Sequence, residues 1–159
     1  MHPNAKLIET FYTAFKNKDV DTLASLYHPD VHFTDPAFGD LRGKMPAAMW
    51  RMLLSNNESN LEVTFRDIQA DDTRGSAHWD ARYIFTATGR PVLNRIDASF
   101  EFKDGKIIRH IDRFDMHRWS RQALGLSGLL LGWTPIVRNK VQKNARGRLD
   151  AYVAKHGLK

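Results

Sequence analysis

The stretch IDASFEFKDGKIIRHIDRF, residues 96–114, decides the fold because it holds two strands and the turn between them. Apolar and polar residues alternate in its first half, where the apolar set is Ile96, Ala98, Phe100 and Phe102. Alternation with a period of two is typical of a strand with one buried face. The dipeptide Asp104-Gly105 follows and is a strong signal for a tight turn between antiparallel strands. The stretch therefore predicts a β-hairpin.

The length of the hairpin loop decides which side chains point into the protein. With a two-residue loop, Asp97 lies directly opposite Asp112, so that two like charges face each other. With the three-residue loop Lys103-Asp104-Gly105, whose glycine is left-handed, Asp112 faces Ile96 instead. The second register collects the apolar residues on one face and charges that can pair on the other. Since a slip of one residue reverses the two faces, we predict the three-residue loop.

Upstream of the hairpin, helices are followed by strands. Apolar residues at helical spacing predict a helix over residues 3–17, and Asp19 is a good N-cap for a second short helix that carries Tyr27. Gly39 and Gly43 mark a loop. The other predicted elements are a strand over 31–35, a helix over 45–55 and strands over 61–65 and 79–85. Consecutive strands with short turns predict an antiparallel meander, and the fold class is α+β.

Composition excludes several kinds of site. The chain has 159 residues, enough for one domain, with 42% hydrophobic and 26% charged residues and no cysteine. Disulfides, thiolate metal sites and cysteine nucleophiles are therefore excluded. The sequence has no phosphate-binding glycine loop, no GxSxG and no HExxH motif, so we expect neither a metal nor a cofactor. The N-terminus has no apolar signal core, and we expect a cytoplasmic protein.

The positive charge is confined to the C-terminal end of the chain. Residues 1–115 carry 15 basic and 17 acidic residues, a balance of −2, whereas residues 116–159 carry 9 and 1, a balance of +8. Such a segment can bind nucleic acid or an anionic membrane. It is also typical of the solvated face of an amphipathic helix, which we favour because of the apolar stripe Val137, Val141, Ala145 and Leu149. Residues 119–135, glycine-broken and ending near Trp133, are either a packed extension or a lid.

Two segments resemble a known superfamily. They are FYTAFKNKDVDTLASLYHPDVHFTDP, residues 11–36, and FEFKDGKIIRHIDRFD, residues 100–115. Their pattern resembles the nuclear transport factor 2-like superfamily, which includes SnoaL-like polyketide cyclases and ketosteroid isomerases. The resemblance implies a cone-shaped domain over residues 1–115, in which a curved antiparallel sheet wraps around N-terminal helices and a pocket lies at the wide end. Residues 116–159 fall outside the shared pattern, and we expect them to form a basic helical extension that packs on the same domain or on a dimer.

Three residues are candidates for catalysis. In the favoured register His110 and Asp112 are polar residues on an apolar wall, where burial is costly without a partner. They form either a proton-transfer pair or a pair that satisfies a buried tyrosine or backbone group. SnoaL-like cyclases carry acid and base residues on this last strand. Asp35 shares the inward parity of Val31 and either assists, as the general base of the isomerases does, or caps the following Asp-Pro turn.

Aromatic residues can line a pocket for a flat apolar ligand. The candidates are Tyr12, Trp50, Trp79, Tyr83 and Phe100. Tyr12 could also donate a hydrogen bond to a developing oxyanion, although Phe11 stands at the isomerase tyrosine position in the plainest alignment. An ordinary hydrophobic core explains the same residues.

Two functions fit these residues. The first is a cofactor-independent enzyme that moves a proton on a small, largely apolar organic molecule, as an isomerase, cyclase or dehydratase, with Asp112 as base or acid, His110 as relay and Asp35 assisting. The second is a non-catalytic ligand-binding or dimeric interaction module. We expect a homodimer through the outer face of the sheet, because Ile107 and Ile111 are predicted there, and neither nucleic acid nor membrane as a partner.

Overall fold

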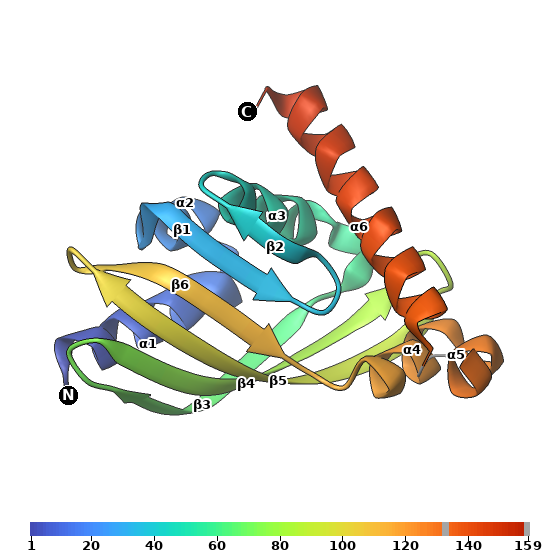
Figure 1. Ribbon diagram of the computed structural model, residues 1–159, viewed down its shortest axis with the longest axis horizontal. Helices are drawn as coiled ribbons and strands as arrows, with labels where there is room; N and C mark the ends of the chain where they lie inside the picture. The colour runs from blue at the N-terminus through green and yellow to red at the C-terminus, as the bar shows by residue number, and fades with distance from the viewer. Residues whose placement is uncertain (132–133, 158–159) are drawn as a thin grey trace.

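The computed structural model describes residues 1–131 and 134–157 and shows helices on one side of a curved, open sheet (Figure 1). Its elements up to the sheet meander are α1 (Pro3–Lys16), α2 (Val20–Ser25), β1 (Tyr27–Asp35), β2 (Gly39–Arg42), α3 (Met45–Ser55) and η1 (Asn57–Ser59). The Asp19 side chain caps α2 by accepting from Thr22 N, as the sequence predicts.

The sheet has six strands in the order β2-β1-β6-β5-β4-β3. The remaining strands are β3 (Glu62–Ala70), β4 (Arg74–Phe85), β5 (Arg90–Lys103) and β6 (Lys106–Arg113). The predicted antiparallel meander β3 to β6 is confirmed, but β1 runs parallel to β6, so the whole sheet is mixed. The predicted loop around Gly39 is wrong in one respect, because Gly39–Arg42 pairs with β1 as an edge strand.

The hairpin between β5 and β6 has a two-residue loop, so the predicted three-residue loop is wrong. Asp104 and Gly105 both have positive φ, 55° and 72°, and Lys103 pairs with Lys106. This is the geometry in which the turn twists with the strands, and it favours Asp-Gly.

A register shift beyond the turn restores the predicted faces. Phe102 pairs with Ile107, but Glu101 pairs with Arg109, so one extra residue is accommodated between them. Asp112 lies opposite Ala98, two residues away from the predicted Ile96. Because a shift by two residues keeps the parity of a strand, Asp112 still points into the protein.

The extra residue changes the position of one apolar side chain. Ile107 is fully buried in the core, which corrects the prediction that it lies on the outer face of the sheet. Ile111 is half-buried and pairs with Ser99. Less apolar surface is therefore left on the outer face than the sequence predicts.

The core fills the concave side of the sheet, with α1 lying across it (Figure 1). Ile8, Phe11 and Phe15, one turn or so apart on α1, are buried against aromatic residues of the sheet. Gly75 of β4 permits the close approach, because a Cβ there would lie 2.7 Å from Ile8 Cδ1.

Three helices follow the sheet: α4 (Met116–Leu124), α5 (Leu126–Leu131) and α6 (Pro135–His156). Leu149 and Val153 of α6 are buried in the core, and the face that carries Val141 and Ala145 is half-buried. Trp133, at the end of the predicted lid segment, lies outside the described residues. No helix among residues 1–131 and 134–157 is long and apolar enough to cross a membrane.

Candidate functional site

A chain of hydrogen bonds runs through the core between α3 and the sheet. Trp50 Nε1 donates to the Tyr27 hydroxyl at 2.9 Å, and that hydroxyl lies 2.9 Å from His110 Nδ1. His110 Nε2 lies 2.9 Å from Asp112 Oδ1, and Trp79 Nε1 donates to the same oxygen at 3.4 Å. The predicted pair His110 and Asp112 is thus joined to a buried tyrosine, one of the two roles that the sequence left open.

The Trp50 N–H, at one end of this series of hydrogen bonds, determines the direction in which every following bond is donated. An indole N–H can only donate, so the Tyr27 oxygen accepts from Trp50 and has its own hydrogen left for His110 Nδ1. The proton of a neutral His110 is then on Nε2 and points at the Asp112 carboxylate. Every hydrogen of the network has an acceptor in this arrangement. His110 is therefore oriented from one side by Tyr27 and presents an N–H to Asp112 from the other.

Tyr12 lies beside this network without joining it. Its hydroxyl is fully buried and has no hydrogen-bond partner among the described residues. Burial, followed by the nearby Asp112 charge, raises the pKa of Tyr12 well above its usual value. Burial also raises the pKa of Tyr27, so both phenols are neutral at physiological pH.

Asp35, at the end of β1, caps the turn that follows the strand and also has a raised pKa. Its Oδ1 accepts from the backbone N–H groups of Ala37 and Phe38, so the carboxyl caps the turn that the Asp-Pro sequence predicts. Burial nevertheless raises the pKa of Asp35 to about 7, against the lowering effect of the Phe38 N–H, and the Asp112 charge contributes to the rise. Asp35 therefore exists in both protonation states near neutral pH.

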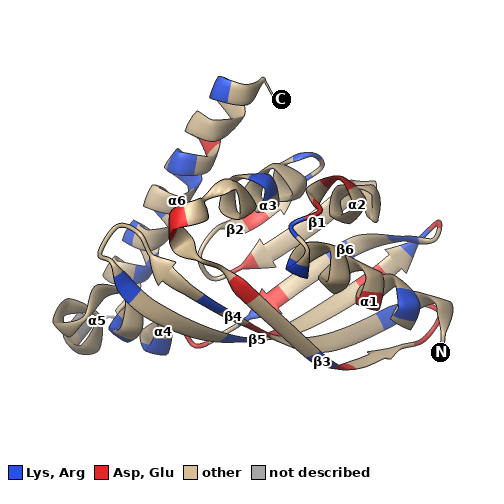
Figure 2. Ribbon diagram, turned by 180° about the vertical axis from the view of Figure 1, so that it is seen from behind, with Lys and Arg blue, Asp and Glu red and all other residues tan. Residues whose placement is uncertain are grey.

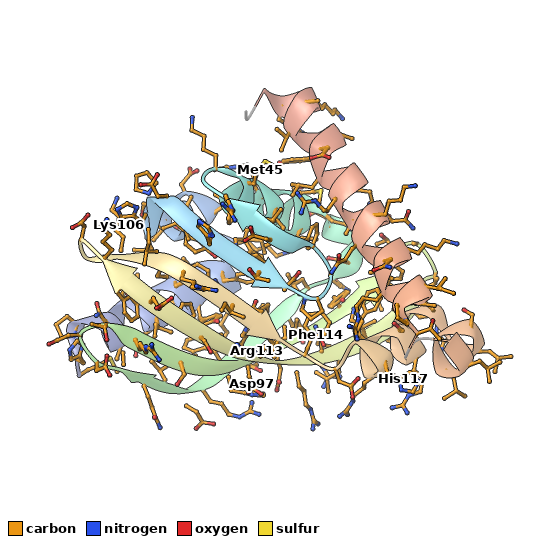
Figure 3. The ribbon with its side chains drawn as sticks, viewed as in Figure 1. Met45, Asp97, Lys106, Arg113, Phe114 and His117 are labelled. Atoms are coloured by element: carbon orange, nitrogen blue, oxygen red, sulfur yellow. The ribbon has the colours of Figure 1, made fainter. Side chains whose placement is uncertain are left out.

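Asp35 and Asp112 line one hollow of about 610 Å³. Its wall consists of residues 34–36 from the end of β1, residues 111–117 from β6 into α4, and Arg138 and Gln142 of α6. Figure 3 shows Arg113, Phe114 and His117 where β6 leaves the sheet toward α4, whereas Lys106 marks the opposite end of the strand. The hollow thus lies at the end of the sheet where β1, β6 and α6 meet.

Helix α6 holds the turn that carries Asp35. Gln142 Nε2 donates to Pro36 O at 3.1 Å, and Arg146 Nη1 donates to Phe38 O at 3.3 Å and to Asp40 O at 3.1 Å. The same turn is capped from the other side by Asp35. The position of the carboxyl therefore depends on two elements that are more than 100 residues apart in the chain.

The structure brings the three predicted catalytic residues to one end of the core, but it places the predicted aromatic lining elsewhere. Tyr12, Trp50, Trp79 and Phe100 are buried in the main core, and none of them is among the residues of the hollow. Tyr83 accepts a hydrogen bond from Trp119 Nε1 at 2.6 Å and is half-buried. In the part of the chain that the structure describes, no three His, Asp or Glu side chains are grouped as metal ligands.

Sequence reasoning missed Tyr27 and the two α6 residues of the hollow. Tyr27 is the first residue of β1 rather than the last apolar residue of α2. Its odd number, shared with Val31 and Asp35, is the signal that could have placed it on the inward face. Arg138 and Gln142 carry no comparable signal, because the packing of a long helix on a distant turn is not a local property of the sequence.

Comparisons with known proteins agree with this architecture. A model of the SnoaL-like domain family matches residues 8–110. An LEH-like epoxide hydrolase from Mycobacterium tuberculosis is 24% identical with a TM-score of 0.65, and the match covers 81% of this chain and 96% of that protein. A search of curated proteins found no significant match.

Two further solved structures have the same fold. A Xanthomonas campestris protein classed provisionally as a polyketide cyclase is 25% identical with a TM-score of 0.61, over 76% of this chain and 96% of that one. A nuclear transport factor 2-like protein of unknown function from Burkholderia pseudomallei is 18% identical with a TM-score of 0.65, over 77% and 98%. The family match ends at residue 110, so α6 lies outside it.

Proposed function

Because the chain belongs to the SnoaL-like domain family, within the nuclear transport factor 2-like superfamily, we propose that it binds a small, largely apolar organic molecule and moves a proton on it without a cofactor. One observation carries the proposal: Asp35, with a pKa of about 7, shares a hollow with Asp112. A carboxyl that gains and loses its proton near neutral pH is suited to general acid–base catalysis. The family includes cyclases and isomerases, and proton transfer of this kind is consistent with that membership.

The proposed step needs only the ligand and the two carboxyls. The Asp35 carboxylate takes a proton from a carbon next to a carbonyl group; the C–H bond breaks and its electron pair leaves the negative charge on the carbonyl oxygen. The neutral Asp35 then returns the proton to another carbon or to oxygen of the same molecule, which completes an isomerisation. Asp112, held by His110 and Trp79, is the second carboxyl of the site and contributes to the raised pKa of Asp35.

Exchange of carbon-bound protons for deuterium tests the proposal without knowledge of the natural substrate. The protein is incubated in D₂O at neutral pH with a panel of phenyl-substituted alkyl ketones such as 4-phenylbutan-2-one, whose uncatalysed exchange is slow, and the loss of the α-proton signal is followed by NMR. We expect at least roughly 100-fold acceleration for the best probe, the lower range for general base catalysis. Asp35→Asn keeps an oxygen for the turn N–H groups but removes the base, and should return the rate to that of buffer.

Asp150→Asn is the matched control, because it removes the same charge from an exposed position on α6. It should leave the exchange rate unchanged. Exchange at the buffer rate with every ketone, or an undiminished rate in Asp35→Asn, would contradict the proton-transfer proposal.

A second function, a non-catalytic ligand-binding module, is favoured by a different observation. Both carboxyls already have hydrogen-bond donors within the protein, Asp35 from its turn and Asp112 from His110 and Trp79. Binding of ketones in the hollow without any exchange would support this module and not the enzyme.

We also propose that the protein forms a homodimer through the outer face of the sheet, where Ile111 remains half-exposed. Light scattering at tens of micromolar should give twice the chain mass of 18.3 kDa. Ile111→Lys should then reduce the mass to that of the monomer, while Ile136→Lys, at a highly exposed position on α6, should not. A monomer mass for the unmodified protein would refute the dimer.

A further inference from the structure

We propose that the hollow takes a small organic anion and that Arg138 of α6 binds its negatively charged group. The inference rests on the proposed function in that it concerns the same hollow, and it names the class of ligand. The ligand has an apolar body and one acidic group, such as a carboxylate, and its reactive carbon lies toward Asp35.

The acidic residues of the hollow are already paired with donors. Asp35 accepts from two backbone N–H groups, and Asp112 accepts from His110 and Trp79. Asp115 is the N-cap of α4 and accepts from Arg118 N at 3.1 Å. The carboxylate oxygens around the hollow thus already accept hydrogen bonds from N–H groups of the protein, although their charges remain.

The basic residues of the hollow differ in this respect. Among the described residues, the Arg113 side chain makes one hydrogen bond, from Nη1 to Ser99 Oγ at 3.2 Å, and this hydroxyl is neutral. Arg138 lines the hollow, and its guanidinium has neither a hydrogen bond nor an ion pair with any residue in the described ranges 1–131 and 134–157. The charge that is available to a ligand is therefore positive.

The position of Arg138 near the start of α6 strengthens the positive potential around its guanidinium group. It lies in the first turn of α6, which begins at Pro135 and has 22 residues, so the partial positive charge of the helix N-terminus adds to that of the guanidinium. Figure 2 shows lysine and arginine distributed along α6. The segment 116–159 has nine basic residues and one acidic residue, Asp150, so the carboxylates near Arg138 are those of Asp35, Asp112 and Asp115 in the wall of the hollow.

The remaining wall fixes the character of the rest of the ligand. Ile111, Phe114 and Met116 contribute apolar surface to the hollow, and its volume of about 610 Å³ is within the range of small-molecule sites. A planar guanidinium binds a carboxylate through two parallel N–H groups, which fixes orientation as well as affinity. Arg138 is thus placed to orient a carboxylate whose apolar body extends toward Asp35.

Paired probes of the same shape test the charge preference. Benzoate and benzamide differ in charge and hardly in size, and each is titrated into ¹⁵N-labelled full-length protein at neutral pH while the amide resonances of residues 111–117 are followed. We expect benzoate to bind roughly tenfold more tightly than benzamide, as expected for one charge-assisted contact. Arg138→Gln should remove this preference, and Arg138→Lys should restore part of it because a lysine keeps the charge but not the planar fork.

Lys140→Gln is the matched control, since it removes a positive charge from an exposed position two residues further along α6. It should keep the full preference for benzoate, and the spectrum of each variant shows directly whether it is folded. Equal affinity for the two probes, no shift at residues 111–117, or an undiminished preference in Arg138→Gln overturns the inference. Asp35-dependent deuterium exchange with neutral ketones would then still support proton transfer, whereas an Arg138-dependent preference without exchange would support anion binding alone.

Discussion

The Asp35 carboxyl is exposed to opposing effects that a sequence cannot weigh. Two backbone N–H groups lower its pKa, while burial and the Asp112 charge raise it, and burial is the largest of these effects. The result, a pKa of about 7 against a usual value near 3.8, has a consequence for stability. Between these two values the folded protein keeps a proton that the unfolded chain has lost, so stability falls as pH rises through this window and is constant above it.

Asp35→Asn should therefore stabilise the protein at pH 8 and have little effect near pH 4. The expected gain in the free energy of unfolding at pH 8 is on the order of 2–4 kcal/mol, from about 1.4 kcal/mol for each unit of pKa. Urea unfolding of the two proteins from pH 4 to pH 8 measures it. A gain that does not depend on pH would mean that Asp35 has an ordinary pKa, and Asp150→Asn should show no gain.

Tyr27 is the residue on which the buried network depends. Tyr27→Phe leaves the Trp50 N–H and His110 Nδ1 without partners in a site that water does not reach. We expect a loss of about 2–4 kcal/mol in the free energy of unfolding, because each unpaired buried group costs about 1–3 kcal/mol. Denaturant titration measures the loss. Tyr152→Phe, on half-buried α6 surface, should change stability by less than about 0.5 kcal/mol.

Single residues were predictable from the sequence to different degrees. His110 and Asp112 could be predicted because they interrupt an apolar alternation, which is a local pattern. Their partner Tyr27 could not be predicted, because the boundary between α2 and β1 falls within two residues of it. A tyrosine at this position fits both the helical spacing of α2 and the alternation of β1. The raised pKa of Asp35 depends on the surrounding packing, which no local pattern encodes.

At the scale of elements, the β5–β6 hairpin shows how a wrong loop can leave the faces correct. The Asp-Gly turn adopts the tight form with positive φ at both residues, and the shift before Arg109 compensates for it. The segregation of apolar and charged side chains between the two faces depends on parity alone. Parity therefore identified the inward face, but the pairing partners and the place of Ile107 also depend on the bulge.

Helix α4 covers the first part of β5, which pairs with β4 on one side but has no strand on the β6 side before Asp97. Leu93 N donates to Gln122 Oε1 at 2.8 Å, and Gln122 Nε2 donates to Leu93 O at 3.2 Å, so a side-chain amide takes the place of a strand. Gln122→Ala should speed hydrogen exchange of the Leu93 amide roughly five- to tenfold, since about 1 kcal/mol of hydrogen bonding is lost. Amide exchange followed by NMR measures this. An unchanged rate would contradict the role of Gln122, and Arg121→Ala, exposed on the same helix, should leave the rate unaltered.

At the scale of the molecule, α6 packs the C-terminal end of the chain against α3 and the turn that follows β1. It is anchored in the core at Leu149 and Val153 and reaches the Asp35 turn through Gln142 and Arg146. The amphipathic stripe in the sequence predicts which face packs, because Leu149 belongs to it. The surface on which the helix rests could not be predicted, since α3 and the β1–β2 turn come together only through the sheet order.

Leu149→Ala tests whether this anchoring controls the site. Leu149 is buried to 1% exposure, so its truncation should lower the free energy of unfolding by about 2–4 kcal/mol, the range for a buried leucine. Because α6 helps to cover the hollow, the looser helix should also admit water to Asp35 and lower the pKa of that carboxyl from about 7 toward its usual value. Carboxyl ¹³C chemical shifts followed against pH measure the pKa, and urea unfolding measures the stability.

Leu129→Ala, at a position 46% exposed on α5, should alter neither quantity. A destabilised Leu149→Ala protein whose Asp35 still titrates near 7 would show that the carboxyl is buried by its own turn and the sheet, and that α6 only stabilises the fold.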